Sequence, residues 1–243
     1  MDGYELALRF SYITNLLRFC GPDGASSQFI RYLKKKDNSK EVEESLRRFE
    51  GLYPYLSAIA SKSSRQFTDY EVVEAYWIGN PLLELFGDED IRLIIKSLMQ
   101  RGLPSSIGQR LLRDIPHGFV PHHNFNVFYV GVGNTTGSVE TTLSNMDNCR
   151  ISWGSVIERS GDTLFVNVPS LKKSDESYCL GESETKTVVF LPEMIGHVKK
   201  GDIVALHWGF AAMILNENQL NNLKRYTLSI FDVLNTKLKK SHC

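Results

Sequence analysis

The sequence predicts an α+β fold, with an N-terminal all-helical domain followed by a small β-barrel and a C-terminal helix. Three observations lead to this prediction. Apolar residues in the first half recur every three or four positions, which is the period of an amphipathic helix. After residue 149, short β-type segments alternate with turn residues. Beyond residue 216 the helical spacing returns and continues toward the C-terminus.

The first half divides into several helices where proline or glycine interrupts the pattern. A first helix is expected over residues 3–19, before a turn rich in glycine. Residues 40–61 also have helical spacing, but Pro54 is expected to split them. Asn80-Pro81 interrupts a later helix in the same way. We therefore expect a helical domain over residues 1–115.

The character of the chain changes at residues 116–148. Within this region, residues 125–132 (FNVFYVGV) are dense in aromatic and β-branched side chains, which predicts a buried strand. The polar run 134–148 predicts a long loop or linker. The glycines of residues 131–137 (GVGNTTG) lack the lysine and the following helix of a phosphate-binding loop, so we interpret this segment as a turn.

Residues 149–243 are expected to form the barrel and the C-terminal helix. A five-stranded, partly open barrel of the oligonucleotide-binding type (OB-like) fits the short strands, and many unrelated functions share this shape. The final helix is expected to start at Asn216, with Gln219 completing a capping box. The predicted strands cover residues 150–158, 163–168, 178–180, 185–191 and 202–208.

Composition limits the class of protein. Lysine plus arginine and aspartate plus glutamate each total 28 in the 243 residues, so long-range attraction to nucleic acid or to anionic lipid has no general support. The N-terminus shows neither a signal peptide nor a membrane span, and we expect a cytoplasmic protein. Four cysteines without a CxxC pair argue against a disulfide scaffold and against a zinc site of cysteines alone.

Two residues of the C-terminal part are candidates for chemistry. His207 interrupts the apolar strand of GDIVALHWGFAA (201–212), where it is either a core histidine bonded to a carbonyl or a functional ring. Cys149 lies between the polar linker and the first strand, where we expect solvent to reach its thiol; the alternative is a small buried side chain. If the fold brings them close together, this thiol and this imidazole can form one functional site.

The C-terminal third resembles the HypC-type chaperones of nickel–iron hydrogenase maturation, which are small barrel proteins. Their opening cysteine pattern is similar to residues 149–156, with Trp153 in place of the family's proline. Their second signature, Gly-Asp, a strand with a histidine and then Gly-Phe-Ala, is similar to residues 201–211. The family cysteine follows the initiator methionine, whereas Cys149 is internal. The N-terminal 140 or so residues have no counterpart in that family.

The resemblance implies a metal site at Cys149 and His207. It implies that the chain transiently ligates iron, as an iron–carbonyl–cyanide fragment, and that its partners are hydrogenase maturation proteins or the hydrogenase large subunit. A thiolate is a suitable soft ligand for such iron. The whole chain also looks like an uncharacterised bacterial family of similar length. This second resemblance implies no particular activity.

Three further residues are possible members of a site: His122, His123 and Glu74. Neighbouring histidines of an extended segment point to opposite faces, so at most one of them is expected to join Cys149 and His207. For both, and for Glu74, packing or solvation is the alternative. A different class of function also stays open, namely an enzyme with a Cys/His site, with or without a metal, between the two halves. Neither a GxSxG nor an HExxH motif occurs.

Overall fold

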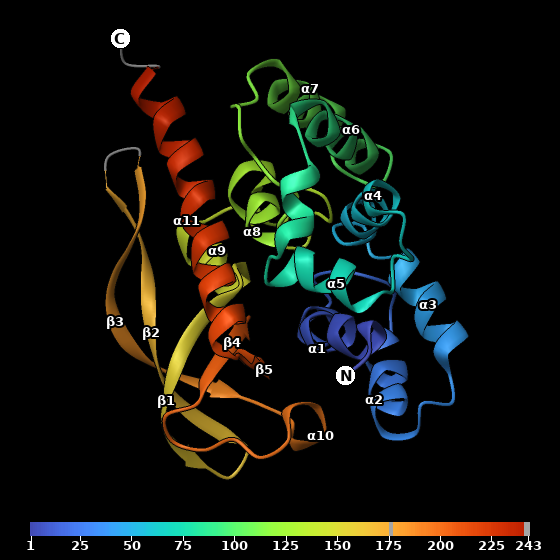
Figure 1. Cartoon of the computed structure of the whole chain (residues 1–243), viewed down its shortest axis with the longest axis vertical. Helices are drawn as coiled ribbons and strands as arrows, with labels where there is room; N and C mark the ends of the chain where they lie inside the picture. Colours follow the sequence, from blue (N-terminus) through green and yellow to red (C-terminus); the bar gives the residue numbers. More distant parts are fainter. Residues whose placement is uncertain (175–176, 241–243) are drawn as a thin grey trace.

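A computed structural model of the chain describes residues 1–174 and 177–240. Figure 1 shows helices α1–α7 on one side of the molecule, and strands β1–β3 with the long helix α11 on the other. The first group is α1 (Gly3–Leu16), α2 (Ala25–Lys35), α3 (Ser39–Arg47), α4 (Tyr53–Ser63), α5 (Tyr70–Trp77), η1 (Pro81–Leu85), α6 (Asp88–Met99) and α7 (Ser105–Arg113). The predicted helical N-terminal part is confirmed.

Local chemistry explains where these helices begin. The Asp2 carboxylate accepts the backbone N–H of Glu5 at 2.7 Å and thereby caps α1. Pro54 lies in the first turn of α4, where its missing N–H costs nothing, so the predicted split of residues 40–61 is correct. Asn80 interrupts the chain as expected, because its side chain accepts the N–H of Leu82 and starts η1.

The predicted strand over residues 125–132 is wrong. The segment forms α8 (His123–Phe125) and a π-helical turn, η2 (Asn126–Gly131). Its side chains are buried on nearly all sides, and a fully buried helix has the same apolar composition as a buried strand. The polar run 134–148 is a loop only in its first part, because Thr142 caps α9 (Leu143–Cys149).

The β segments form one sheet that closes on itself in the order β1-β2-β3-β5-β4. Neighbouring strands are antiparallel, except that β3 and β5 meet in parallel at Val189 and Phe210. The predicted strand at 178–180 and the first five residues of the one at 185–191 belong to a single strand, β3, which ends at Val189. Strand β5 follows the His207 strand and was not predicted. The strands are β1 (Ser152–Ser160), β2 (Thr163–Ser174), β3 (Ser177–Val189), β4 (Ile203–His207) and β5 (Phe210–Ile214).

The chain has two parts: the helical part, which comprises α1–α9 with η1, η2 and their connecting loops, and the barrel with α10 and α11. The two parts share one hydrophobic core. Helix α10 (Pro192–Ile195) contacts α2, and α1 contacts β5. Helix α11 (Glu217–Lys240) starts with the predicted capping box, in which Asn216 and Gln219 each accept the other's backbone N–H. The helix then packs along β3 (Figure 1). The boundaries of a helical domain at residue 115 and of a barrel at residue 149 stay a prediction.

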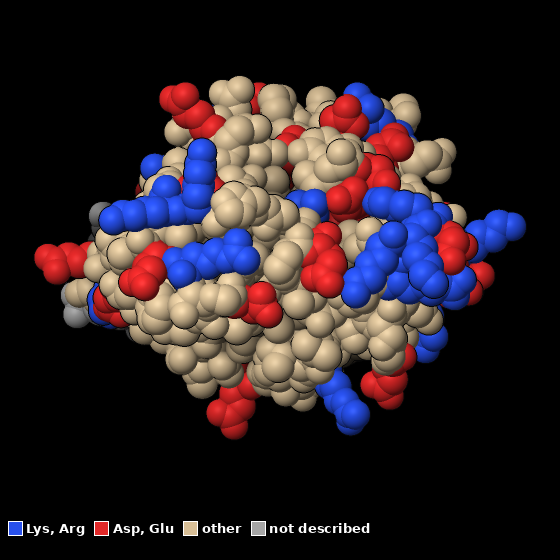
Figure 2. Space-filling view, turned by 90° about the horizontal axis from the view of Figure 1, so that it is seen from below, with Lys and Arg blue, Asp and Glu red and all other residues tan. Residues whose placement is uncertain are grey.

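The surface matches the neutral composition. On the face seen in Figure 2, basic and acidic side chains lie beside one another. The surface of the molecule carries exposed ion pairs, such as Lys34 with Glu193 and Lys172 with Glu184. Among the described residues, no helix combines the length and the apolar character that a membrane crossing requires.

Candidate functional site

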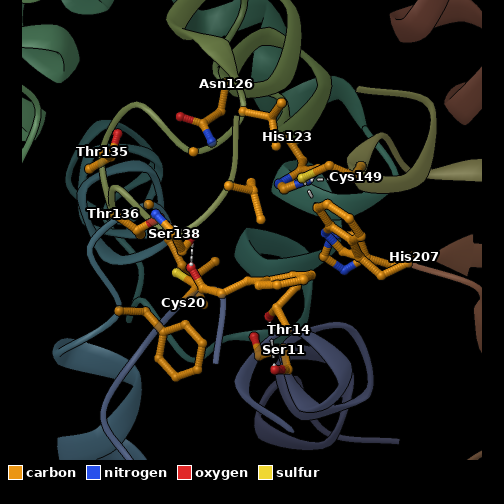
Figure 3. A pocket seen from close by; sticks show the side chains of 18 of the residues that line it. Ser11, Thr14, Cys20, His123, Asn126, Thr135, Thr136, Ser138, Cys149 and His207 are labelled. Atoms are coloured by element: carbon orange, nitrogen blue, oxygen red, sulfur yellow. Dashed lines mark hydrogen bonds between the residues drawn. The ribbon is translucent and has the colours of Figure 1, made fainter. Parts of the chain in front are cut away.

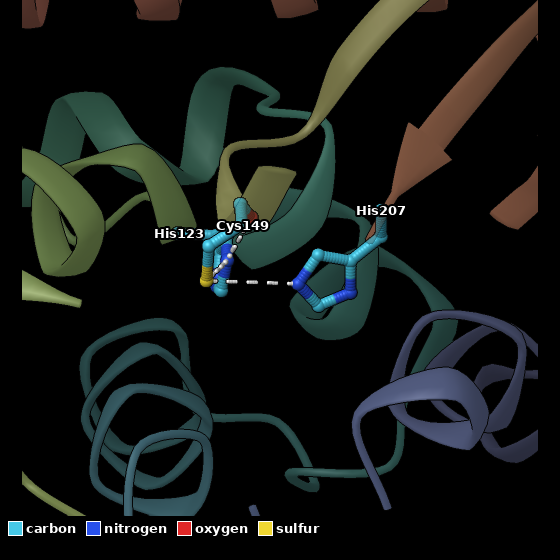
Figure 4. Close-up of side chains that lie close together, drawn as sticks. All are labelled: His123, Cys149 and His207. Atoms are coloured by element: carbon cyan, nitrogen blue, oxygen red, sulfur yellow. Dashed lines mark hydrogen bonds between the residues drawn. The ribbon is translucent and has the colours of Figure 1, made fainter. Parts of the chain in front are cut away.

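Three side chains from separate parts of the chain meet in the interior: His123 at the start of α8, Cys149 at the end of α9 and His207 at the end of β4 (Figure 4). Cys149 Sγ lies 3.8 Å from His123 Nε2 and 3.9 Å from His207 Nε2. The three ligand atoms all lie within 4.8 Å of one another, so this group could hold a metal ion. The predicted closeness of Cys149 and His207 is correct.

His207 is held by a tight hairpin between β4 and β5. Its strand pairs His207 with Phe210, and both residues of the connecting turn, Trp208 and Gly209, have positive φ, as a type I′ turn requires. Nδ1 of His207 donates to the Phe10 carbonyl at 2.9 Å, which fixes the tautomer and leaves the lone pair of Nε2 facing the sulfur. Burial lowers the pKa of His207 to about 4, so the ring is neutral at neutral pH.

His123 lies in a chain of contacts that lacks one proton. Its Nδ1 is 2.9 Å from the Tyr76 hydroxyl, which contacts the Gly51 carbonyl at 2.8 Å, and its Nε2 is 3.0 Å from the Cys149 carbonyl. Three hydrogen bonds need three protons, but a tyrosine and a neutral imidazole supply two. Burial holds the pKa of His123 well below its ordinary value, so protonation of the ring does not supply the third. A metal ion on Nε2 would replace the hydrogen bond to the Cys149 carbonyl. The ring proton on Nδ1 and the hydroxyl proton of Tyr76 would then be enough for the two remaining hydrogen bonds.

Cys149 is buried, with 8% of the residue exposed, so the expected access of solvent to its thiol is wrong. Cys149 is one of the buried residues of α9, and residues of loop 131–139 line the same cavity as its side chain. Burial raises the pKa of this thiol to about 12, although a hydrogen bond from the Trp208 side chain opposes the rise. The thiol is therefore protonated at neutral pH and is a poor nucleophile, unless a cation stabilises the thiolate.

A cavity of about 70 Å³ adjoins the three ligands (Figure 3). It lies between the helical part and the barrel, since α1, α5, the loop after η2 and the β4–β5 turn all contribute to its wall. Among the residues that the structure describes, no lysine, arginine, aspartate or glutamate lines it. Its polar and sulfur-containing lining residues are Ser11, Thr14, Cys20, Tyr76, Trp77, His123, Asn126, Thr135, Thr136, Ser138, Cys149, His207 and Trp208.

The donor set fits a transition metal. One thiolate and two imidazoles suit zinc or ferrous iron, and carboxylate-preferring ions such as Mg²⁺ or Ca²⁺ do not match it. Three protein ligands are one fewer than a closed tetrahedral site requires, and the cavity adjoins these ligands. The arrangement is therefore that of a site with room for an external ligand.

The other candidates have different roles. His122 is buried but does not line the cavity: its Nδ1 accepts the Asn124 N–H, and its ring lies against Tyr226 of α11. Glu74 accepts hydrogen bonds from Tyr70 and Gln219 and does not line the cavity, so neither His122 nor Glu74 joins the cluster.

Sequence reasoning missed two parts of the wall. Cys20 lines the cavity, and its thiol donates toward Glu50. Residues 131–137, interpreted as a turn, belong to a loop that lines the cavity, and Ser138 ties this loop to the Phe19 carbonyl at 2.8 Å. The closely spaced glycines were the available signal: a Cβ on Gly133 (φ +80°) would lie 1.9 Å from the Val139 carbonyl oxygen.

Comparison with known proteins gives a family and no activity. No curated protein and no solved structure matches the chain. One family profile matches residues 1–241 and thus joins the helical part, the barrel and the histidine–cysteine cluster in one unit. The chain belongs to that family, the family of unknown function DUF6390.

Proposed function

We propose that this chain is an accessory protein that holds an iron fragment for a metalloenzyme, with nickel–iron hydrogenase as the first candidate. The observation that supports the proposal is the 3.9 Å separation of Cys149 Sγ and His207 Nε2. These residues lie 58 positions apart in the sequence, and they are the pair that the resemblance to HypC-type chaperones assigns to iron.

The arrangement of strands also supports this proposal. An antiparallel ring with one parallel contact between β3 and β5 suits an OB-like barrel of the HypC type. Cys149 precedes the first strand of the ring and His207 ends the fourth. The helical part adds His123, so the proposed iron site has a third ligand from within the same chain.

The chain's own residues explain how iron would be held and released. His123 and His207 are neutral, so they need lose no proton before they bind a metal. The Cys149 thiol gives up its proton to solvent when the cation arrives, and the charge of the cation then replaces that of the proton. Acid reverses this exchange, because the proton competes with iron for the sulfur and both imidazoles.

Metal analysis and infrared spectroscopy of protein purified without oxygen test the proposal. Wild-type protein expressed together with the hydrogenase maturation proteins is expected to contain about one iron per chain and to show carbonyl and cyanide bands. Cys149→Ala and His207→Ala are expected to lose both signals. Cys179→Ala and His197→Ala are matched controls, since both residues are exposed. Iron-free wild-type protein, or a Cys149→Ala variant that keeps its iron and its bands, would refute the proposal.

The cavity favours a second candidate, a metal-dependent enzyme. Its wall comes from both halves of the chain and has several hydroxyl groups, as a small substrate would require. An enzyme retains its metal, whereas a carrier must release it. Metal that passes to a chelator within minutes at neutral pH would support the carrier. Retention for many hours, together with missing carbonyl and cyanide bands, would support the enzyme.

A further inference from the structure

Three buried polar groups that line the cavity have no hydrogen-bond partner among the described residues. They are Ser11 Oγ of α1, Trp77 Nε1 of α5 and Thr135 Oγ1 of the loop after η2. Their residues are 1%, 3% and 7% exposed, respectively. An unpaired buried polar group destabilises the folded protein, so three beside one cavity indicate a ligand that completes their bonding.

The neighbouring hydroxyl groups differ in this respect. Thr14 Oγ1 donates to the Ser11 carbonyl at 3.0 Å, and Thr136 Oγ1 is paired with Ser138 Oγ at 2.6 Å. Ser11 Oγ, Trp77 Nε1 and Thr135 Oγ1 therefore differ from these two hydroxyl groups, which have partners. The indole N–H of Trp77 can only donate, and its ring lies close to both imidazoles, with centroids 4.6 Å from His123 and 5.5 Å from His207.

Charge identifies the kind of ligand. A divalent metal on one thiolate and two neutral imidazoles leaves one positive charge in the interior. Within the described part of the chain, no charged side chain lines the cavity to balance this charge. An unbalanced buried charge is costly, and a monovalent anion on the metal would make the site neutral. The far end of such an anion would need hydrogen-bond donors.

We propose that the cavity binds a small monovalent anion, with one end on the metal and the other end held by Ser11, Trp77 and Thr135. This inference rests on the metal site of the proposed function and adds the ligand that the site receives. A cavity of about 70 Å³ has room for a molecule of a few heavy atoms, so a diatomic or linear triatomic anion fits in it. The helical part supplies all three donors, so recognition of the anion is a function of that part.

Azide is the probe, and protein loaded with Co²⁺ is the reporter. Co²⁺ takes the same N/S ligands as ferrous iron, and its visible absorption changes when a further ligand binds. Wild-type protein is expected to bind one Co²⁺ and then one azide. Ser11→Ala and Thr135→Val should each weaken azide binding by roughly 5- to 10-fold without changing the Co²⁺ stoichiometry, because each removes one donor. Thr136→Val is the matched control, with azide affinity expected within about twofold of wild type.

The outcomes separate this inference from the proposed function. If Co²⁺ binds and azide affinity is unchanged in Ser11→Ala, Thr135→Val and Trp77→Phe, the anion site is refuted while the metal site stands. If Co²⁺ does not bind, both fail. Acetonitrile, a neutral linear molecule of three heavy atoms, tests the charge argument. Displacement of azide by acetonitrile at equal concentration would refute the preference for an anion.

Discussion

His207 uses its two ring nitrogens for two different purposes. Nδ1 donates to the Phe10 carbonyl and ties the barrel to α1, while Nε2 faces the Cys149 sulfur. The two roles expected from the sequence, a packed core histidine and a functional ring, are therefore compatible. A carbonyl partner on one nitrogen is what orients the other nitrogen toward a metal.

Acid should destabilise the metal-free protein through this ring. The pKa of His207 is about 4 in the folded state, against an ordinary value of 6.5, so its full contribution is present above pH 6.5 and is lost as the pH falls toward 4. Urea titrations in chelator at pH 7 and pH 4 should show a loss from His207 of about 3 kcal/mol in the free energy of unfolding.

His207→Asn is the variant that isolates this contribution. An asparagine amide does not titrate, and its nitrogen can take the place of Nδ1 and donate to the Phe10 carbonyl, so the loss of stability between pH 7 and pH 4 should become smaller. Part of the loss should remain, because burial also lowers the pKa of His122, to about 3, and that of His123. An unchanged pH dependence in this variant would mean that His207 is not the buried neutral ring described above.

Thiol reactivity should differ strongly among the cysteines of the native protein. Cys179 is exposed, whereas Cys149 is buried and has a thiol pKa of about 12. We expect iodoacetamide at pH 8 to modify Cys179 at least roughly a hundredfold faster than Cys149, by mass spectrometry of the peptides. The difference should disappear in urea. Fast native modification of Cys149 would favour the nucleophilic enzyme over a buried metal site. Cys243 lies outside the described residues.

At the scale of elements, Asn124 fixes the distance between two proposed ligands. Its Oδ1 accepts the Ile151 N–H at 2.9 Å, and its Nδ2 donates to Thr227 Oγ1 at 2.8 Å. The side chain is fully buried and joins α8, the start of β1 and α11. His123 precedes Asn124 directly, and Cys149 lies two residues before Ile151, so this network positions both ligands.

Asn124→Ala should therefore affect both stability and metal affinity. The change leaves the Ile151 N–H unpaired in the core, and we expect the free energy of unfolding to fall by about 2–4 kcal/mol. Co²⁺ affinity should fall by at least roughly tenfold, because neither ligand is then held in place. Asn221→Ala, on the exposed surface of α11, is the matched control and should change neither quantity. Wild-type affinity in a destabilised Asn124→Ala protein would contradict the positioning role.

Elements with strong local signals could be predicted from the sequence, and those set by tertiary contacts could not. Proline and asparagine residues marked the helix boundaries around residues 54 and 80, and the capping box marked the start of α11. The segment 125–132 is apolar on all sides, so no period distinguished helix from strand. Cys149 and His207 could be paired through a resemblance, but His123 joins them only because α8, absent from the prediction, turns it inward.

At the scale of the whole molecule, the helical part and the barrel depend on each other. The His207 ring donates to α1, Asn124 donates to the carbonyl of Ile151 directly before β1, and Gln219 of α11 donates to Glu74 of α5 at 2.9 Å. These contacts are buried or partly buried, and the apolar core continues across them. Each part would expose apolar side chains to water if the other part were unfolded, so we expect the two parts to fold as one cooperative unit.

Tryptophan fluorescence can test this cooperativity, because each part has its own reporter. Trp77 lies in α5, and Trp153 lies in β1. A variant with Trp153 and Trp208 replaced by phenylalanine reports on the helical part, and Trp77→Phe reports on the barrel. In each variant, the urea midpoint from fluorescence should coincide with the midpoint from far-ultraviolet circular dichroism of the same protein.

A metal ion should then stabilise both parts by the same amount, since its ligands come from both. At a free Co²⁺ concentration of 100 times the dissociation constant, the gain is about 2.7 kcal/mol, and both reporters should record it. Cys149→Ala should remove the gain in both. Two separate transitions, or a gain confined to the barrel reporter, would show that the helical part neither folds with the barrel nor supplies a ligand, and His123 would then return to a packing role.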